Sequence, residues 1–144
     1  MREFTIRTAS LDDALAIARL MSQLGYSTSA DEMQTRLRNI LSTSSYMTLV
    51  AEIHKEVVGM VGIGVGFYYE KNGVYGRLLA LAIDERYRRQ GIGAALVKKA
   101  EGWLQEHKVT SIVVNSGTHR KGAHCFYKKL GYEETGLRFV KSLS

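Results

Sequence analysis

The sequence has no proline, a single cysteine and no long apolar run, and each shortage excludes a class of protein. Because Cys125 has no second cysteine to pair with, an internal disulfide framework is excluded, and so is a cysteine-rich zinc site. No apolar run approaches the roughly 18 residues that a membrane span needs. Residues 1–7 contain no apolar stretch of the kind found in a secretory signal peptide. We therefore expect a cytoplasmic protein with no metal site and no membrane partner.

Length and composition place the chain among ordinary globular proteins. Its 144 residues match one domain of roughly 150 residues, so we expect a single domain over residues 1–144. Apolar residues make up 45% and charged residues 24%, which excludes a disordered chain.

Charge is uneven along the chain, although the net charge is only +6. Residues 1–85 carry 8 basic and 10 acidic side chains, whereas residues 86–144 carry 12 basic and 4 acidic ones. This asymmetry indicates that the second part meets an anion, which could be nucleic acid, a membrane surface or a small phosphorylated cofactor. The simpler alternative is a solvated basic surface that keeps the protein soluble.

Hydrophobic periodicity and turn residues predict alternating helices and strands. Strands are expected at residues 4–8, 46–53, 56–69, 74–83, 110–115 and 133–143. Helices are expected from Ser10 or Asp12 to Gly25, from Ser29 or Asp31 to Leu41, from Ile92 to about His107, and at residues 120–130. The order β α α β β β α β α β predicts a mixed α/β (α+β) fold. It has a mostly antiparallel sheet flanked by helices, and a helix joins the fourth and fifth strands.

Details of these elements give further expectations. The first two helices should bury Leu11, Leu15, Ala18, Met21 and Leu24, and Met33, Leu37, Ile40 and Leu41. Within residues 57–67 the even positions Gly62, Gly64 and Gly66 carry no side chain, which leaves part of one strand face bare; either a helix packs there or a ligand approaches the backbone. Residues 78–83 are apolar on both faces, which predicts a central strand covered on both sides.

The segment from Arg88 to Ala94, Arg-Arg-Gln-Gly-Ile-Gly-Ala, joins a buried strand to the start of a helix. The first turn of a helix has unpaired N–H groups and a partial positive charge. Gly91 and Gly93 remove side chains that would hold a phosphate off the backbone, and two arginines add charge. The segment therefore predicts a pyrophosphate cradle. A dinucleotide fingerprint fails because its third glycine would fall at Leu96.

Two motifs resemble the GNAT acetyltransferase superfamily. Arg88-x-x-Gly91-x-Gly93 resembles its acyl-CoA pyrophosphate loop, and the stretch from Ala123 to Tyr132 resembles its A-x-x-F-Y-x-x-L-G-F signature. The order of elements matches over essentially the whole chain. Three positions depart from the common pattern, which has proline, glycine and asparagine where this chain has Glu85, Arg89 and Arg120. The departure at Arg89 leaves the cradle intact and adds a charge.

The resemblance implies an enzyme that transfers an acetyl group from acetyl-CoA to a primary amine of a small molecule or peptide, by direct attack in a ternary complex. It implies that N–H groups near Ile83 stabilise the thioester oxygen and that Tyr127 protonates the leaving sulfur. Tyr127 could instead be a core residue. The residues implied to bind acetyl-CoA are Leu81, Ala82, Ile83, Arg88, Arg89, Gln90, Gly91, Ile92, Gly93, Ala94, Asn115 and Tyr127.

The general base and the acceptor site are less determined. Base candidates are Glu70, Asp84, Glu85, His119 and His124, with His119 preferred because it follows the strand that ends at Asn115. Asp84 and Glu85 fit better as residues that cap or solvate the loop. Residues 25–29, with Tyr26, Tyr68 and Tyr69, are the expected acceptor side, unless these are ordinary surface tyrosines.

Other functions remain to be weighed against the enzyme. A GNAT fold could bind acyl-CoA as a sensor or regulatory module without turnover. We expect no nucleic-acid partner, because aromatic residues are not interleaved with the basic residues. The final strand could support a homodimer. Because acidic residues are concentrated in the first 85 positions, linear charge predicts a preference for cationic amines.

Overall fold

The computed structural model describes residues 3–115 and 121–143, apart from the side chain of Lys121. These residues form two units, Met1–Val113 and Val114–Ser144, and each is described by itself. The prediction of a single domain over residues 1–144 stays a prediction.

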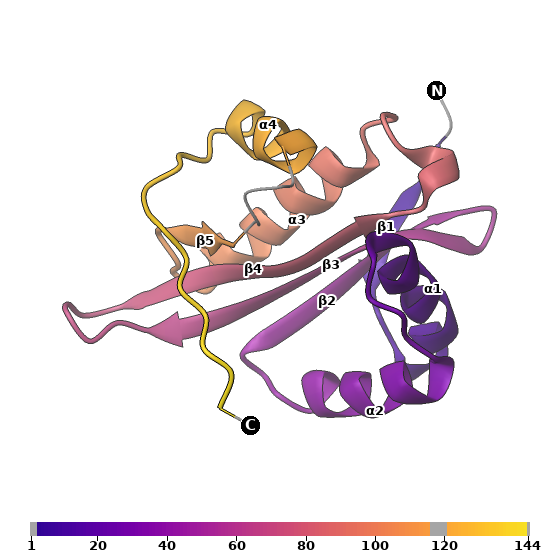
Figure 1. Ribbon diagram of the computed structural model, residues 1–144, viewed down its shortest axis with the longest axis horizontal. Coiled ribbons are helices and arrows are strands. Elements are labelled where there is room, and N and C mark those ends of the chain that lie inside the picture. Colours follow the sequence, from indigo (N-terminus) through magenta and orange to yellow (C-terminus); the bar gives the residue numbers. More distant parts are fainter. Residues whose placement is uncertain (1–2, 116–120, 144) are drawn as a thin grey trace. The chain divides into compact units, whose positions relative to one another are not determined.

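A five-stranded sheet carries the first unit and is arranged in chain order (Figure 1). Its strands are β1 (Thr5–Thr8), β2 (Tyr46–Ile53), β3 (Glu56–Phe67), β4 (Val74–Ile83) and β5 (Ile112–Val114). The pairs β1–β2, β2–β3 and β3–β4 are antiparallel, as predicted. The Gly76 N–H donates to the Ser111 carbonyl at 2.8 Å, beside the start of β5.

Two hairpin turns join the central strands. Between β2 and β3, His54 and Lys55 both have positive φ angles, 49° and 66°, as a tight two-residue hairpin turn requires. The turn after β3 is longer than the predicted one, because Phe67 pairs with Val74 and only Gly73 has a positive φ, 107°. β3 therefore ends two residues before its expected end at Tyr69.

Side-chain caps start the first two helices. Ser10 and Asp13 form a capping box before a 3-10 turn, Leu11–Asp13, that leads into α1 (Ala14–Leu24). Ser29 and Glu32 form the same box at α2 (Ala30–Leu41), which decides between the two predicted starts.

The predicted buried face of α1 is partly wrong. Leu15 is 57% exposed, whereas Ala14, Ile17, Ala18 and Leu20 are buried. At 100° per residue, Leu15 lies outside the face of α1 that Ala14, Ile17 and Ala18 form. In α2, Met33 and Leu37 are buried as predicted, but Leu41 in the last turn is exposed.

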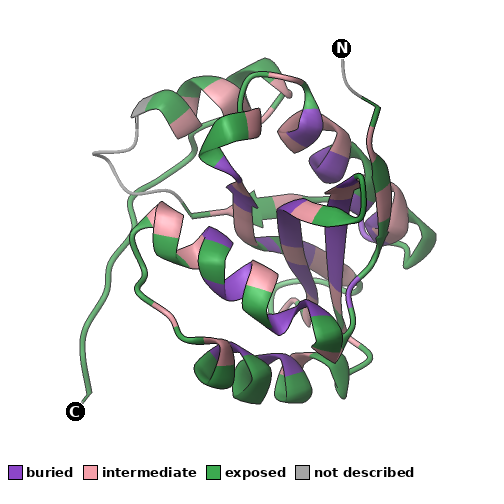
Figure 2. Cartoon of the chain, turned by 90° about the vertical axis from the view of Figure 1, so that its right-hand side faces the viewer, coloured by how far each residue is buried: buried purple, intermediate pink, exposed green. Residues whose placement is uncertain are grey.

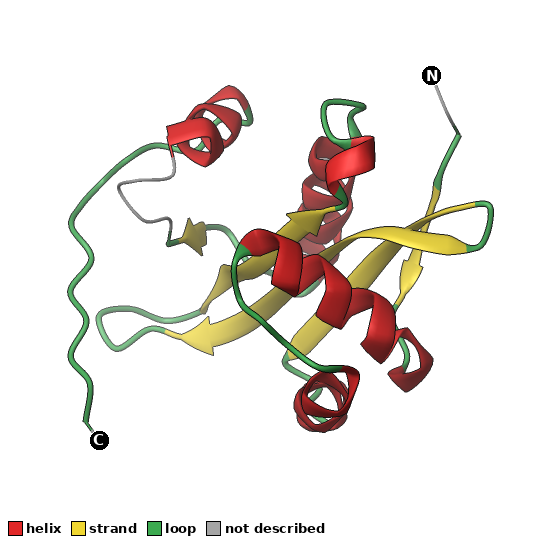
Figure 3. Ribbon diagram, turned by 45° about the vertical axis from the view of Figure 1, so that its right-hand side comes forward, coloured by secondary structure: helices red, strands yellow, loops and turns green. Residues whose placement is uncertain are grey.

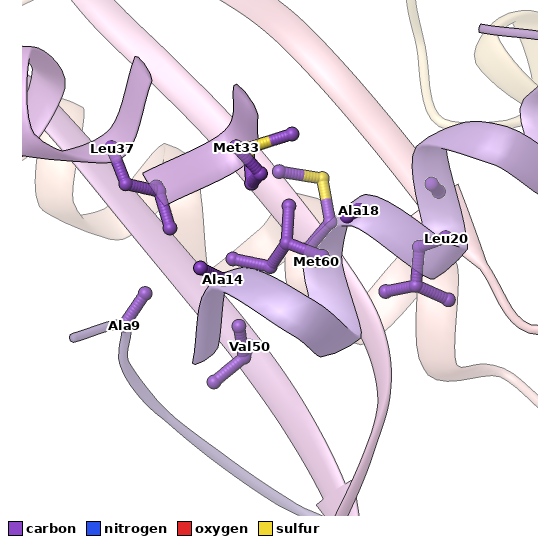
Figure 4. Close-up of a cluster of buried hydrophobic side chains, with 10 residues drawn as sticks. Ala9, Ala14, Ala18, Leu20, Met33, Leu37, Val50 and Met60 are labelled. Atoms are coloured by element: carbon purple, nitrogen blue, oxygen red, sulfur yellow. The ribbon is translucent and has the colours of Figure 1, made fainter. Parts of the chain in front are cut away.

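The helices of this unit cover both faces of the sheet. Side chains of α1 and α2 pack on Val50, Met60 and Ala82, and Figure 4 shows Met33 and Met60 within this cluster. On the opposite face lies α3 (Ile92–Glu106), which buries Ile92, Leu96, Val97, Ala100 and Leu104. Figure 2 shows the buried residues gathered where helices and strands meet.

Strand β4 carries a β-bulge. Leu78 pairs with Ile63 and Ala80 with Gly62, so Leu79 is an extra residue with no partner on β3. Leu79 is 49% exposed, which corrects the prediction that this strand is covered on both sides along its whole length.

Two of the β3 glycines, Gly64 and Gly66, are explained by neighbouring tyrosines. Ring carbons of Tyr46 lie 2.7 Å from where a Cβ on Gly64 would stand, and ring carbons of Tyr75 lie 3.0 Å from that position on Gly66. The bare positions therefore let rings from the adjacent strands lie flat on the sheet, which is neither of the two predicted explanations.

The second unit contains α4 (Lys121–Lys129), which is followed by Gly131 with a φ of 94°. The Tyr132 N–H bonds to the Tyr127 carbonyl and the Gly131 N–H to the Lys128 carbonyl, a Schellman motif.

The predicted strand at residues 133–143 is wrong. These residues form no strand, and Figure 3 draws them as loop. Alternating apolar residues need a hydrogen-bonded neighbour to become a strand, and no ladder to residues 133–143 exists among the described residues. Leu137 and Phe139 are accordingly more than 80% exposed.

Candidate functional site

The backbone between β4 and α3 turns sharply twice. After Ile83 a 3-10 turn, Glu85–Tyr87, leads to Arg88, and then Arg89 and Gly91 adopt positive φ angles of 64° and 85°. Gly91 is the N-cap of α3 and supplies no side-chain cap. Such left-handed residues at a helix start turn successive N–H groups toward one side.

These N–H groups are available to a ligand. In the part of the chain that the structure describes, no acceptor bonds to the N–H groups of residues 88–94, and helical bonding starts at the Ala95 N–H, 3.1 Å from the Gly91 carbonyl. No atom lies within 4 Å of where a Cβ on Gly91 would stand. A row of donors, an open space above it and the positive end of a helix dipole fit a pyrophosphate.

The two arginines of the loop differ in their contacts. The Arg88 Nε donates to the Ile83 carbonyl at 3.1 Å and so ties the loop back to the end of β4. Both Arg88 and Arg89 are exposed, so their charge adds to the electrostatic attraction for an anion.

A buried carboxylate anchors the start of the loop. Asp84 is only 4% exposed and accepts bonds from the Arg86 Nε and Nη2, both at 3.0 Å, and from the Arg86 N–H. The Arg86 guanidinium also bonds to Glu56 at 2.9 Å. Its bonds to Asp84 hold the pKa of that carboxyl below its ordinary value, although burial acts in the opposite direction. Asp84 thus caps and fixes the turn, and its engagement with Arg86 argues against a role as general base.

One residue of α1 also reaches this turn. The Gln23 Oε1 accepts from the Glu85 N–H at 3.0 Å, and the Gln23 side chain makes the smallest contribution to the lowered pKa of Asp84. Sequence reasoning missed Gln23, Arg86 and Glu56. No local pattern could have found them, because Gln23 and Glu56 lie 62 and 30 residues from their partners.

The end of β4 presents N–H groups at its second edge. The Asp84 N–H bonds to the Val58 carbonyl on β3 at 2.8 Å. Because N–H directions alternate along a strand, those of Leu81 and Ile83 point away from β3. Ala82, between them, is buried in the core of α1 and α2. The predicted residues of β4 and those of the loop from Arg88 to Ala94 therefore lie close together in the first unit, and their binding of acetyl-CoA stays a prediction.

The remaining predicted site residues belong to the second unit or lie outside the described residues. Tyr127 is half-buried in α4, and its ring meets those of Phe126 and Tyr132 at centroid distances of 5.2 and 5.7 Å. Asn115 is exposed after β5, and His124 is half-buried on α4. His119 falls outside the described residues. That these residues belong to the same site as the loop from Arg88 to Ala94 stays a prediction.

Two kinds of feature are absent from the described residues, a group of metal ligands and a membrane-spanning helix. No group of His, Cys, Asp or Glu side chains there could hold a metal ion. None of the helices described is long and apolar enough to cross a membrane.

Comparison with known proteins gives consistent results. The model of the acetyltransferase (GNAT) family matches residues 14–132. An uncharacterised N-acetyltransferase of Chlorobaculum tepidum is 33% identical over 132 residues, which cover 90% of this chain and 75% of that protein. The aminoalkylphosphonate N-acetyltransferase of Salmonella typhimurium is 27% identical over 143 residues, covering 96% and 90% of the two chains.

A solved structure shares the fold. A GNAT family acetyltransferase of Staphylococcus aureus superposes with a TM-score of 0.83 at 26% identity, over 97% of this chain and 98% of that one. An aminoglycoside 6'-N-acetyltransferase of Acinetobacter haemolyticus has the same TM-score at 20% identity, over 97% and 99% of the two chains, and shows a common fold alone.

Proposed function

This chain belongs to the acetyltransferase (GNAT) family, and on that premise we propose that it transfers an acetyl group from acetyl-CoA to a primary amine of a small molecule or peptide. The amine attacks directly, in a ternary complex of enzyme and both substrates.

The observation that carries the proposal is the row of unbonded N–H groups at residues 88–94, beside the left-handed Gly91. The backbone from Arg89 to Ala94 would hold the CoA pyrophosphate, and Arg88 and Arg89 would add charge. Asp84, Arg86 and Gln23 keep this backbone in place through the bonds given above.

Acetyl-CoA, when bound, supplies the acetyl group as an activated thioester. The outward N–H groups of Leu81 and Ile83 would stabilise negative charge on the reacting carbonyl oxygen. Ala82 completes the backbone of β4 between these two N–H groups.

Tyr127 would donate a proton to the departing sulfur. A free tyrosine has a pKa of about 10 and a free thiol one of about 8.5, so complete transfer is uphill by roughly 2 kcal/mol. A hydrogen bond that strengthens as the thiolate forms lowers this barrier without complete transfer. We assign the base that deprotonates the amine to His119, the preferred candidate of the sequence.

The relatives extend the range of acceptors to be tested. Two of these relatives are named aminoalkylphosphonate N-acetyltransferase and N-alpha-acetyltransferase 30. A small amine and a peptide amine therefore both belong in the test.

The experiment measures thiol release from acetyl-CoA with a panel of amines, together with the rise in melting temperature that CoA causes. Turnover above hydrolysis with at least one amine supports the enzyme. A thermal shift without turnover on any amine supports the non-catalytic acyl-CoA sensor instead. No shift at CoA concentrations far above a plausible Kd contradicts both, because a ligand that binds only the folded state must stabilise it.

A further inference from the structure

One face of the sheet carries an arginine that the acetyl-CoA site does not use. Tyr46 of β2 pairs with Gly64 of β3, and Gly64 pairs with Arg77 of β4. Paired residues of an antiparallel sheet project from the same face. Tyr46 and Arg77 therefore stand on one face with only a glycine between them, and the Tyr46 ring fills the space above that glycine.

This face is the one on which α1 and α2 pack. Met60, four residues from Gly64 on β3 and so on the same face, belongs to the cluster of these helices, whereas Gly76, next to Arg77, faces Leu104 of α3 on the opposite side. The segment between α1 and α2, residues 25–29, is the expected acceptor side. Arg77 thus projects from the sheet face that these two helices share.

Arg77 has no charge partner in the described parts of the chain. It is exposed, and no carboxylate of the described residues lies within 4.0 Å of its guanidinium. Its neighbours on this face are Tyr75, two residues away on β4, and Leu79, whose Cδ1 lies 3.4 Å from the Cβ position of Gly64. An unpaired guanidinium among aromatic and apolar groups suits a planar anionic group, to which it can make two parallel hydrogen bonds.

The position along β4 relates this arginine to the reaction. Arg77 lies four residues before Leu81, which is at most about 13 Å along an extended strand. The Arg77 side chain can cover part of this distance, so a small acceptor would reach from its guanidinium to the N–H groups of Leu81 and Ile83.

We propose that Arg77 anchors the acceptor through an anionic group, so that the preferred substrates are small primary amines that also carry a carboxylate, phosphate or phosphonate. This inference rests on the proposed function. The proposed preference for anionic amines is opposite to the preference for cationic amines that the linear charge distribution predicts. The two differ because Arg77 is a basic residue within the acidic first 85 positions.

The experiment compares matched amines that differ in one charge. 2-Aminoethylphosphonate is paired with its diethyl ester, and β-alanine with β-alaninamide; putrescine represents the cationic amines. We expect the wild type to prefer the anionic member of a pair, and the two pairs distinguish phosphonate from carboxylate.

Variants at Arg77 then assign the preference. Arg77→Gln should lower kcat/KM for the preferred anionic amine by about 10- to 100-fold, the range for a lost hydrogen bond to a charged group. The neutral partner should change by less than about twofold. Arg77→Lys should keep part of the preference, and Arg77→Glu should reverse it. Arg38→Gln, an exposed arginine on α2, is the matched control.

Two results would overturn the inference: a wild type that prefers neutral or cationic amines, or an Arg77→Gln variant that loses the same factor on both members of a pair. Calorimetry with 2-aminoethylphosphonate in the presence of CoA gives an answer that does not need turnover. If CoA binds but no amine reacts, the proposed function fails. Even then, weaker binding of 2-aminoethylphosphonate by Arg77→Gln than by the wild type would support the anchor. Unchanged binding by Arg77→Gln, or no binding by the wild type, would reject it.

Discussion

The two ends of β4 offer a ligand different kinds of group. Beyond Ile83, the N–H groups of residues 88–94 face no acceptor among the described residues, and a buried carboxylate, Asp84, fixes the turn that precedes them. Around Arg77, at the other end, the exposed groups are side chains, and the backbone is paired with Gly64.

The two kinds of group suit two kinds of ligand, a pyrophosphate and an acceptor. A pyrophosphate can be bound by N–H groups, which every residue except proline provides, so the loop depends on backbone conformation more than on side-chain identity. An acceptor is distinguished by its shape and charge, which only side chains can match. If Arg77 anchors the acceptor as proposed, substitutions near it would change the acceptor while the co-substrate stays the same.

Gly91→Val should cause the largest loss, because valine rarely adopts a φ near 85° and its methyl groups would stand over the N–H row. We expect CoA affinity to fall by more than about 100-fold, which corresponds to the loss of two hydrogen bonds to a charged group. The thermal shift that CoA induces should disappear. Gly102→Val is the control, since Gly102 lies within α3 with no atom near its Cβ position. Normal CoA binding by Gly91→Val would mean that the cradle is elsewhere.

Asp84→Asn should weaken the anchor of the loop and cost about 2 kcal/mol in the free energy of unfolding at pH 7, because Asn cannot pair with the Arg86 charge. The folded-state pKa of Asp84 is lowered, so its stabilisation is complete above the unfolded pKa of about 3.9 and is lost as pH falls through the folded pKa.

Denaturant unfolding at several pH values checks this. The stability difference between wild type and Asp84→Asn should be full at pH 7 and should shrink below pH of about 4. A difference that stays constant with pH would assign the effect to packing instead of charge.

Tyr127→Phe tests a residue that belongs to neither end of β4. The ring and its contacts with Phe126 and Tyr132 remain, while the hydroxyl is lost. We expect kcat to fall about tenfold or more with CoA affinity nearly unchanged, as for loss of a general acid. Tyr132→Phe, which alters the other ring of the pair, should leave kcat nearly unchanged. An equal rate in wild type and Tyr127→Phe would make Tyr127 a core residue.

Gln23→Met should have the smallest effect, because methionine keeps the length of the side chain and removes the bond that the Gln23 Oε1 accepts from the Glu85 N–H. Loss of a neutral hydrogen bond predicts a rise of about two- to tenfold in the CoA dissociation constant, measured by calorimetry. Gln34→Met on the exposed side of α2 is the control. A fall in kcat with unchanged CoA binding would contradict the positioning role.

Much of the fold was predictable wherever the interactions are local. The capping box of Ser29 and Glu32, the stop at Gly25 and the turn at His54 depend on residues a few positions apart. The predictions failed where a distant neighbour decides the outcome. Leu15 lies outside the buried face of α1, Leu79 bulges from β4, and residues 133–143 have no strand partner among the described residues.

The sequence by itself determined that glycines and arginines stand together at a helix start in residues 88–94, a pattern that predicts a phosphate-binding loop wherever the helix lies. Only the tertiary structure decided that Gln23 contacts this segment at the Glu85 N–H and Glu56 at Arg86, and that Arg77 shares a sheet face with Tyr46. The physical reason is sequence distance: hydrogen-bond geometry and strand register between such remote residues are set by packing and leave no pattern in the local sequence.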